Sequence, residues 1–164
     1  MIFTGLIIKH LYRIILLYKT KITAHQKFGV LFIVIFAKIF SMLSILDSEF
    51  SALNTFIQEK NPSQIFILVD ENTHQHCLPT LLGNLDTDVH FEIIEIESGE
   101  DAKNISTVVQ LWEILSDFEA DRKSLLLNLG GGVITDLGGF VASTYKRGIS
   151  FINIPTTLLA MCDA

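Results

Sequence analysis

Three consecutive glycines, Gly130 to Gly132, are the residues of this chain whose type and spacing most clearly suggest chemistry. They follow a short apolar run, Leu125 to Leu129, and precede a segment whose composition is compatible with a helix. A buried strand, a turn without side chains and a helix N-terminus together present backbone N–H groups that can bind a phosphate. Glycine also permits close approach of the backbone and positive φ. A tight strand-to-helix turn has the same composition, so the run alone leaves both interpretations open.

The residues around the glycine run do not complete the dinucleotide fingerprint of a Rossmann fold. Thr135 stands where the third glycine of that fingerprint would lie, and no acidic residue follows at the usual distance of about 20 residues. If a dinucleotide binds here, its ribose must therefore meet carboxylates from earlier in the chain, and Asp70 and Glu100 are placed to serve. Lys103, three residues after Glu100, can fix that carboxylate or donate to the ligand. Each of these side chains alone is also typical of a solvated surface charge.

Further polar residues lie before and after the glycine run. Asp136, near the start of the expected helix, is a favourable partner of the helix dipole. Arg147 follows Lys146 directly before an expected strand, and in a domain suited to phosphate this pair favours anion binding over a plain surface role. The His-x-His-Cys run at residues 74–77 superficially resembles a metal cluster. It lacks a distant second pair of ligands, so we predict no metal site in this chain.

Alternating strands and helices must position these groups. Continuous or alternating apolar residues predict strands over residues 65–69, 89–96, 125–129 and 150–154. Helical patterns are expected over residues 48–60 with Ser48 as cap, over 74–82, from 105 onward, and after the glycine run. This alternation predicts an α/β fold, a Rossmann-like and largely parallel sheet with flanking helices. Ligands bind at the carboxyl ends of such strands, where Asp70, the glycine run and the Thr156-Thr157 pair would share one edge.

Charge is distributed unevenly along the chain. Residues 1–40 contain six basic and no acidic side chains, whereas residues 41–164 contain six basic and eighteen acidic ones, which gives balances of +6 and −12. The acidic part argues against nucleic acid as a partner, because a phosphate backbone needs a basic footprint on the protein. Only two cysteines, Cys77 and Cys162, are present, which fits a reducing compartment, and we predict a cytoplasmic protein.

Residues 1–46 form an apolar, basic extension that differs in composition from the acidic part. A transmembrane helix needs about 20 apolar residues. The longest uninterrupted apolar run of the extension, residues 28–37, contains ten. We expect residues 1–46 not to be part of the domain formed by residues 47–164. A membrane-associated anchor and an unusual native extension are the alternatives.

Three motifs in the second half keep a recognisable order and spacing. They are Gly130 to Asp136 (GGGVITD), Tyr145 to Gly148 (YKRG), and Pro155 to Leu159 (PTTLL) followed by Asp163-Ala164. Together they resemble the 3-dehydroquinate synthase family, over about residues 47–164. The resemblance implies an N-terminal NAD-binding α/β domain. It also implies that a C-terminal helical domain, with a zinc or cobalt ion whose ligands lie outside this chain, is absent here. A homodimer is expected of the full-length enzyme.

The resemblance assigns roles to individual residues of this chain. The expected cofactor-binding residues are Asp70, Glu71, Asn72, Glu100, Asp101, Ala102, Lys103, Gly131, Gly132, Val133, Asp136, Thr156 and Thr157. Gly131 to Val133 would hold the pyrophosphate. Arg147 matches an arginine that binds the substrate phosphate in a neighbouring subunit's site, and Asp163 matches an aspartate that contacts substrate. Thr135 departs from the glycine that is frequent in the family.

The function implied by the resemblance is a lyase step of the shikimate pathway. It converts 3-deoxy-D-arabino-heptulosonate 7-phosphate to 3-dehydroquinate and phosphate, through transient oxidation of a ring hydroxyl by NAD. Because most substrate-contacting residues are expected beyond Ala164, we predict that this chain alone is inactive. The alternatives are another sugar-phosphate cyclase, such as an inosose- or valiolone-type synthase, and a membrane-tethered nucleotide-binding module without catalysis. A glycerol-dehydrogenase-type enzyme is more remote, because its pattern has no place for the YKRG motif.

Overall fold

A computed structural model describes residues 50–163 of the chain. The chain divides into two units, residues 1–45 and 46–164, of which only the second is described in structural terms. The expectations for residues 1–46 and for the Ser48 cap therefore lie outside the described residues. Among the described residues, no helix is long and apolar enough to cross a membrane.

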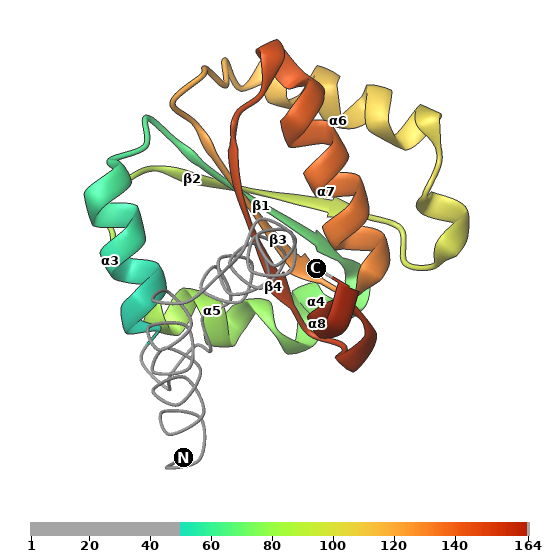
Figure 1. The fold of residues 1–164 in the computed structure, drawn as a ribbon, viewed down its shortest axis with the longest axis horizontal. Coiled ribbons are helices and arrows are strands. Elements are labelled where there is room, and N and C mark those ends of the chain that lie inside the picture. The colour runs from blue at the N-terminus through green and yellow to red at the C-terminus, as the bar shows by residue number, and fades with distance from the viewer. Residues whose placement is uncertain (1–49, 164) are drawn as a thin grey trace, which may run out of the picture. The chain divides into compact units, whose positions relative to one another are not determined.

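Four strands alternate with helices along residues 50–163. In chain order the elements are α3 (Ser51–Lys60), β1 (Ile65–Asp70), α4 (Glu71–His76), α5 (Leu78–Asn84), β2 (Phe91–Ile96), the 3₁₀ turn η2 (Glu100–Ala102), α6 (Ile105–Asp117), β3 (Leu125–Gly130), α7 (Gly132–Thr144), the 3₁₀ turn η3 (Tyr145–Arg147), β4 (Ser150–Pro155) and α8 (Leu158–Asp163) (Figure 1). The predicted α/β class with a parallel sheet is confirmed.

The four strands form one parallel sheet in the order β2-β1-β3-β4. Its register places Ile65 beside both Phe91 and Leu125, and Leu125 beside Ser150. All four strands therefore end at the same edge of the sheet. Consecutive parallel strands need a crossover connection, and each connection here contains a helix. The order matches the first four strands of a doubly wound 2-1-3-4-5 sheet.

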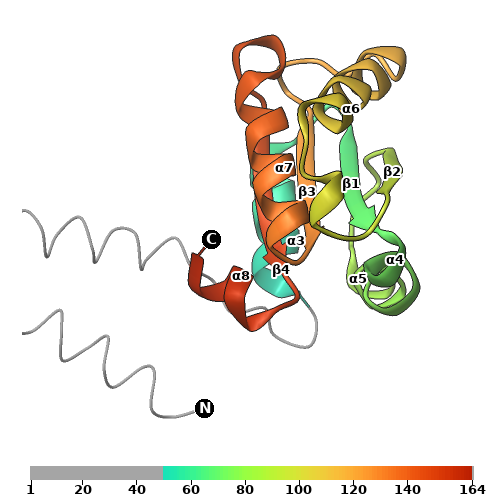
Figure 2. The same ribbon diagram turned by 90° about the vertical axis from the view of Figure 1, so that its right-hand side faces the viewer.

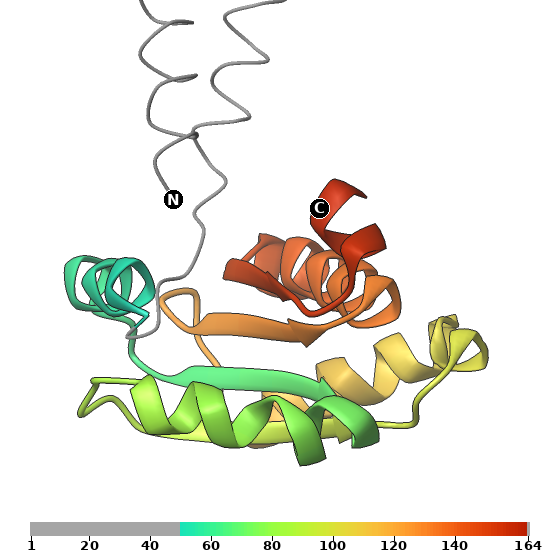
Figure 3. The same ribbon diagram turned by 90° about the horizontal axis from the view of Figure 1, so that it is seen from below.

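Two hydrophobic clusters, one on each face, hold helices against the sheet. One face packs Phe66, Leu126 and their neighbours against α6 and α7, with Leu111, Leu137 and Val141 among the buried residues. The other packs alternate strand residues against α3 and α5, through side chains such as Ile57 and Leu81. Figure 2 shows α7 lying along β3, and Figure 3 shows α4 and α5 end to end beside β1 and β2. Strands β1 and β3 read as continuous apolar runs because both of their faces are covered.

The predicted helix over residues 74–82 is wrong in its bounds. Helix α4 begins directly after Asp70, whose carboxylate accepts from Thr73 N at 2.8 Å while Asp70 N donates to Thr73 Oγ1 at 3.0 Å. This reciprocal capping box starts the helix at Glu71, three residues before the predicted start. The helical segment then breaks at Cys77 into α4 and α5, with Pro79 in the first turn of α5, a position that proline tolerates.

Candidate functional site

The carboxyl ends of β1 and β3 form the point at which the sheet can bind a ligand. These two strands are neighbours, yet the chain leaves β1 toward α4 and α5 and leaves β3 toward α7, on opposite faces. Adjacent loops that depart in opposite directions open a crevice, and ligands of doubly wound sheets bind there. Figures 1 and 2 both show α8 beside the start of α7 at this edge, whereas Figure 2 shows α4 apart from α8, below the ends of β1 and β2.

The glycine run lies at this edge of the sheet, between β3 and α7. None of Gly130, Gly131 and Gly132 has positive φ, so of the two properties that glycine permits, close approach and positive φ, the run does not use the second. The absence of side chains is what the packing requires at two of these positions. A Cβ on Gly130 would lie 2.5 Å from Ile134 Cγ1, and one on Gly131 would lie 3.2 Å from Thr157 Cγ2. A Cβ on Gly132 would meet no described atom within 4 Å, so the start of α7 is open to an approaching group.

Helix α7 presents an N-terminus suited to an anion. Gly131 is its N-cap residue, and no side chain of the described residues caps it. The first N–H groups of a helix have no partner within the helix, and the helix dipole adds partial positive charge there. Thr135, which is buried, donates from Oγ1 to the carbonyls of Gly131 and Gly132 at 3.3 and 3.2 Å. Its hydroxyl is thus satisfied within the first turn, which explains how the helix accommodates a threonine at this position.

Lys103 connects the loop after β2 to α7 across the same edge. Its Nζ lies 2.6 Å from Asp136 Oδ2 and 3.6 Å from Glu100 Oε1. The hydrogen bond to Asp136 and the charge of that carboxylate raise the pKa of Lys103 above its ordinary value, with a smaller contribution from Glu100. The predicted pairing of Lys103 with Glu100 is present, but the closer partner is Asp136, 33 residues further along the chain.

The loops after β1 and β2 are joined by a second contact. Ser98 Oγ donates to Glu71 Oε2 at 3.0 Å, which ties the β2 loop to the first turn of α4. Asn72 is exposed in that turn, and Asp101 and Ala102 lie in η2 beside Glu100. The loops after β1 and β2, which carry the carboxylates predicted to bind the cofactor, are therefore joined to each other at this edge of the sheet. Asp70 has in addition a structural role as the cap of α4, which its sequence signal, a threonine three residues on, could have indicated.

The loop after β4 lies on the other side of the glycine run from the loops after β1 and β2. Thr156 N donates to Gly130 O at 2.9 Å, so the ends of β3 and β4 are joined just beside the glycine run. The Thr157 side chain packs against Gly131, and its hydroxyl accepts from Ala160 N at 3.2 Å in the first turn of α8. The structure therefore brings Thr156 and Thr157 next to Gly131, as the strand pattern predicted.

Arg147 does not join this group. It follows the C-terminal end of α7, a helix of 13 residues that spans about 20 Å from the glycine run at a rise of about 1.5 Å per residue. Arg147 and its neighbour Lys146 both have positive φ, 70° and 47°, in the turn that leads into β4. Asp163 is the last residue of α8, and the position of its side chain lies outside the described part.

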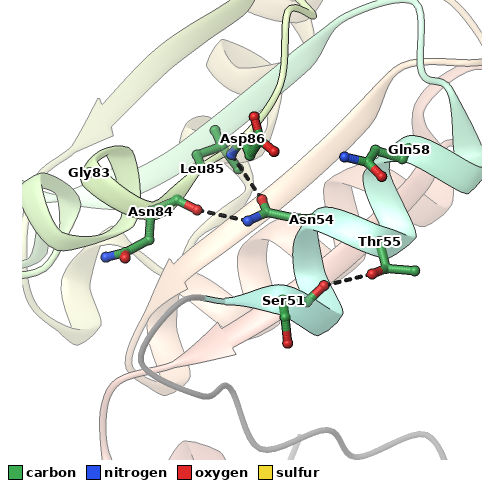
Figure 4. A pocket seen from close by; sticks show the side chains of 8 residues that line it. All are labelled: Ser51, Asn54, Thr55, Gln58, Gly83, Asn84, Leu85 and Asp86. Carbon is green, nitrogen blue, oxygen red and sulfur yellow. Dashed lines mark hydrogen bonds between the residues drawn. The ribbon is translucent and has the colours of Figure 1, made fainter.

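Two other features of the described residues do not form sites. His74 of the His-x-His-Cys run pairs with Glu95, and no group of three metal-binding side chains occurs in residues 50–163. An open hollow is lined by polar residues of α3 and by residues 83–86, and Figure 4 shows Asn54 and Thr55 hydrogen-bonded to other residues of its lining. There Asn54 donates to Asn84 O at 2.8 Å and accepts from Asp86 N at 3.0 Å, a contact that fixes α3 to the end of α5.

The fold has solved relatives. The domain is similar to the crystal structure of 2-deoxy-scyllo-inosose synthase, with a TM-score of 0.57 and 28% identity over 66% of this chain and 31% of that chain. It is also similar to ValA, a 2-epi-5-epi-valiolone synthase from Streptomyces hygroscopicus subsp. jinggangensis 5008 with NAD+ and Zn2+ bound. That TM-score is 0.54, with 32% identity over 62% of this chain and 29% of that chain. The fold is thus an α/β domain of the sugar-phosphate cyclase type.

The chain also has relatives in sequence. Residues 93–164 match the family model described as 3-dehydroquinate synthase N-terminal. The 3-dehydroquinate synthase of Parabacteroides distasonis is 45% identical over 114 residues, which cover 70% of this chain and 32% of the relative. That of Pyrococcus abyssi is 46% identical over 123 residues, 75% of this chain and 36% of the relative. The chain is thus similar in sequence to the N-terminal part of 3-dehydroquinate synthases, and it spans about a third of the length of these curated relatives.

Proposed function

We propose that this domain binds NAD in the crevice between the carboxyl ends of β1 and β3, with the pyrophosphate at the N-terminus of α7. The observation that carries the proposal is the open start of α7, where a Cβ on Gly132 would meet nothing and no described side chain caps the helix. A pyrophosphate oxygen needs this combination of unpaired N–H donors and absent side chains. Gly131, Gly132 and Val133 would donate to it.

The two sides of the crevice would hold the two halves of the cofactor. The adenosine half would lie toward the loops of β1 and β2, where Glu71 and Glu100 offer carboxylates to the ribose hydroxyls. The ammonium group of Lys103 pairs with both Glu100 and Asp136, at 3.6 and 2.6 Å. The half that carries the nicotinamide would lie toward the loop of β4, where Thr156 and Thr157 follow the strand. Two related solved proteins were determined with NAD+ bound, which supports the same ligand here.

The reaction that we propose for the whole protein is that of 3-dehydroquinate synthase. NAD, when bound, supplies the transient oxidation that makes loss of phosphate from 3-deoxy-D-arabino-heptulosonate 7-phosphate feasible. The contribution of this chain is to bind the cofactor and fix its position. Residues 50–163 contain no group that would hold the catalytic metal, so we assign no step to a metal within them. We expect the chain by itself to bind NAD without releasing phosphate from the substrate.

Identity favours this reaction over those of other sugar-phosphate cyclases. The relatives named 3-dehydroquinate synthase are 45 and 46% identical to this chain, whereas the inosose and valiolone synthases are 28 and 32% identical. Arg147 would act in a second subunit, because α7 separates it from the crevice of its own subunit by about 20 Å. We therefore propose a homodimer in which Arg147 binds the substrate phosphate in the partner's site.

Calorimetric titration of the purified chain with NAD and with adenosine tests the cofactor proposal. We expect saturable binding of NAD with one site per domain, tighter than that of adenosine because the pyrophosphate contributes. Equal affinities for NAD and adenosine would mean that α7 does not bind the pyrophosphate. Absence of NAD binding by the folded chain would refute the proposal.

A further inference from the structure

Asn128 is a buried polar residue without an assigned role, and it lies just before the glycine run in β3. Its side chain is 0% exposed. Its Nδ2 donates to Asn153 Oδ1 of β4 at 2.8 Å, and the two asparagines are register partners in the sheet. Its Oδ1 is buried with no hydrogen-bond partner among the described residues. An orphaned amide oxygen in a core destabilises the fold, so its presence calls for a reason.

The same amide sets how closely α7 approaches the sheet. A Cβ on Gly138 of α7 would lie 1.9 Å from Asn128 Oδ1 and 2.2 Å from its Cγ. Helix α7 therefore rests directly on the Asn128 side chain, at a point where only glycine fits. Gly138 is six residues after Gly132, or about 9 Å along the helix axis. The contact thus fixes the depth of the helix close to its open N-terminus.

Asn128 consequently touches or belongs to three of the elements that meet at the phosphate-binding edge. It is part of β3, which leads through Leu129 into Gly130. It supports α7 through Gly138, and it holds β4 through Asn153, three residues before Thr156. Thr156 N in turn donates to Gly130 O at 2.9 Å. Two contacts therefore join β3 to β4 near their carboxyl ends: the side-chain contact of Asn128 with Asn153 and the backbone contact of Thr156 with Gly130.

We propose that Asn128 and Asn153 are positioning residues for the pyrophosphate-binding site. Their amide contact fixes the N-terminus of α7 and the Thr156 loop relative to each other. As a result, the N–H groups of residues 131–133 and the loop of β4 can contact the same bound cofactor. The inference rests on the proposed binding of NAD. It predicts that the pair affects the pyrophosphate and the nicotinamide side of the cofactor but not the adenosine side, which meets the loops of β1 and β2.

Three variants of the full chain test this proposal. Asn153→Val removes the acceptor and leaves the Asn128 amide hydrogens without their partner. Asn153→Asp retains an acceptor oxygen at the same place, and Asn153 is half-buried, so this variant is the conservative rescue. Ser124→Ala is the matched control, because Ser124 is also 0% exposed and hydrogen-bonded but lies at the opposite edge of the sheet, beside Asp121.

The first measurement compares ligands by calorimetry or NMR titration. We expect Asn153→Val to weaken NAD binding about tenfold, the effect of about one hydrogen bond to a charged group. Adenosine binding should stay within twofold, and Asn153→Asp should restore NAD affinity. Ser124→Ala should change neither affinity. Loss of global stability alone would lower both affinities by the same factor. An equal change for both ligands, or no change for NAD, would overturn the proposal.

The second measurement does not need NAD to bind. Hydrogen exchange of the free chain should be faster in Asn153→Val at the amides of Thr135 and Thr156, which donate to Gly131 O and Gly130 O, with Ser124→Ala unchanged there. Uniform acceleration across the sheet, or none, would overturn the positioning role. If the parent chain binds no NAD, the proposed function fails on its own, and the exchange pattern still decides the role of the asparagine pair.

Discussion

The substitution Gly132→Ala separates ligand binding from folding more cleanly than any other change at the site. A Cβ at this position would meet no described atom within 4 Å, so the folded chain accommodates the methyl group without strain. Gly132 is the first residue of α7, and alanine is a better helix former than glycine by about 0.5–1 kcal/mol in a helix interior. We therefore expect the free energy of unfolding to stay unchanged or to rise slightly.

The bound pyrophosphate, in contrast, would meet that methyl group. A hydrogen bond to a charged group contributes roughly 1.5–3 kcal/mol, and about 1.4 kcal/mol corresponds to a factor of ten in affinity. Displacement of one pyrophosphate contact should thus weaken NAD binding roughly ten- to a hundredfold, with adenosine affinity unchanged. Gly83→Ala is the matched control, since Gly83 is also helical and open but lies in α5. Calorimetric titration and urea denaturation measure both quantities. NAD affinity in Gly132→Ala equal to that of Gly83→Ala would refute the proposed position of the pyrophosphate.

Two further substitutions test other contacts of the site. Lys103→Met should weaken NAD binding, because it frees the β2 loop from Asp136. The pKa of Lys103 is raised above its ordinary 10.5 in the folded chain, so its stabilising contribution is complete below about pH 10.5 and is lost as pH rises through the folded value. The difference in Tm between parent and Lys103→Met should therefore shrink above that pH, and a difference that stays constant to pH 12 would contradict the ion pair. Gly138→Ala would place a Cβ 1.9 Å from Asn128 Oδ1 and should destabilise the fold by about 1–3 kcal/mol in urea denaturation. Gly139→Ala, whose Cβ would lie 3.6 Å from Phe151, should be tolerated, and equal losses in the two variants would contradict the close contact at Asn128.

The strands and their common edge could be predicted because local composition determines them. The apolar runs at residues 65–69 and 125–129 are covered on both faces, and this environment produces continuous rather than alternating apolar patterns. Once the strands are parallel, their carboxyl ends must coincide. The clustering of Asp70, the glycine run and Thr156 follows from that geometry. The motif resemblance likewise depends on residues close together in sequence.

What could not be predicted depends on contacts between distant parts of the chain. The ion pair of Lys103 with Asp136 joins a loop to a helix 33 residues later, and no local pattern encodes it. In the sequence, Asn128 is a single polar residue in an apolar strand. Its role could not be predicted because its contacts are with α7 and β4, which follow later in the chain. The run of glycines in the sequence did not indicate which property of glycine the structure uses at these positions. Positive φ and close packing both favour glycine, and only the backbone geometry distinguishes them.

A crystal structure of the chain with NAD tests the central claim most directly. We predict the pyrophosphate at the N-terminus of α7, within hydrogen-bond distance of the N–H groups of Gly131, Gly132 and Val133, with the adenosine toward Glu100 and the nicotinamide toward Thr156. A cofactor bound elsewhere on the domain, or one whose pyrophosphate does not contact α7, would contradict the claim.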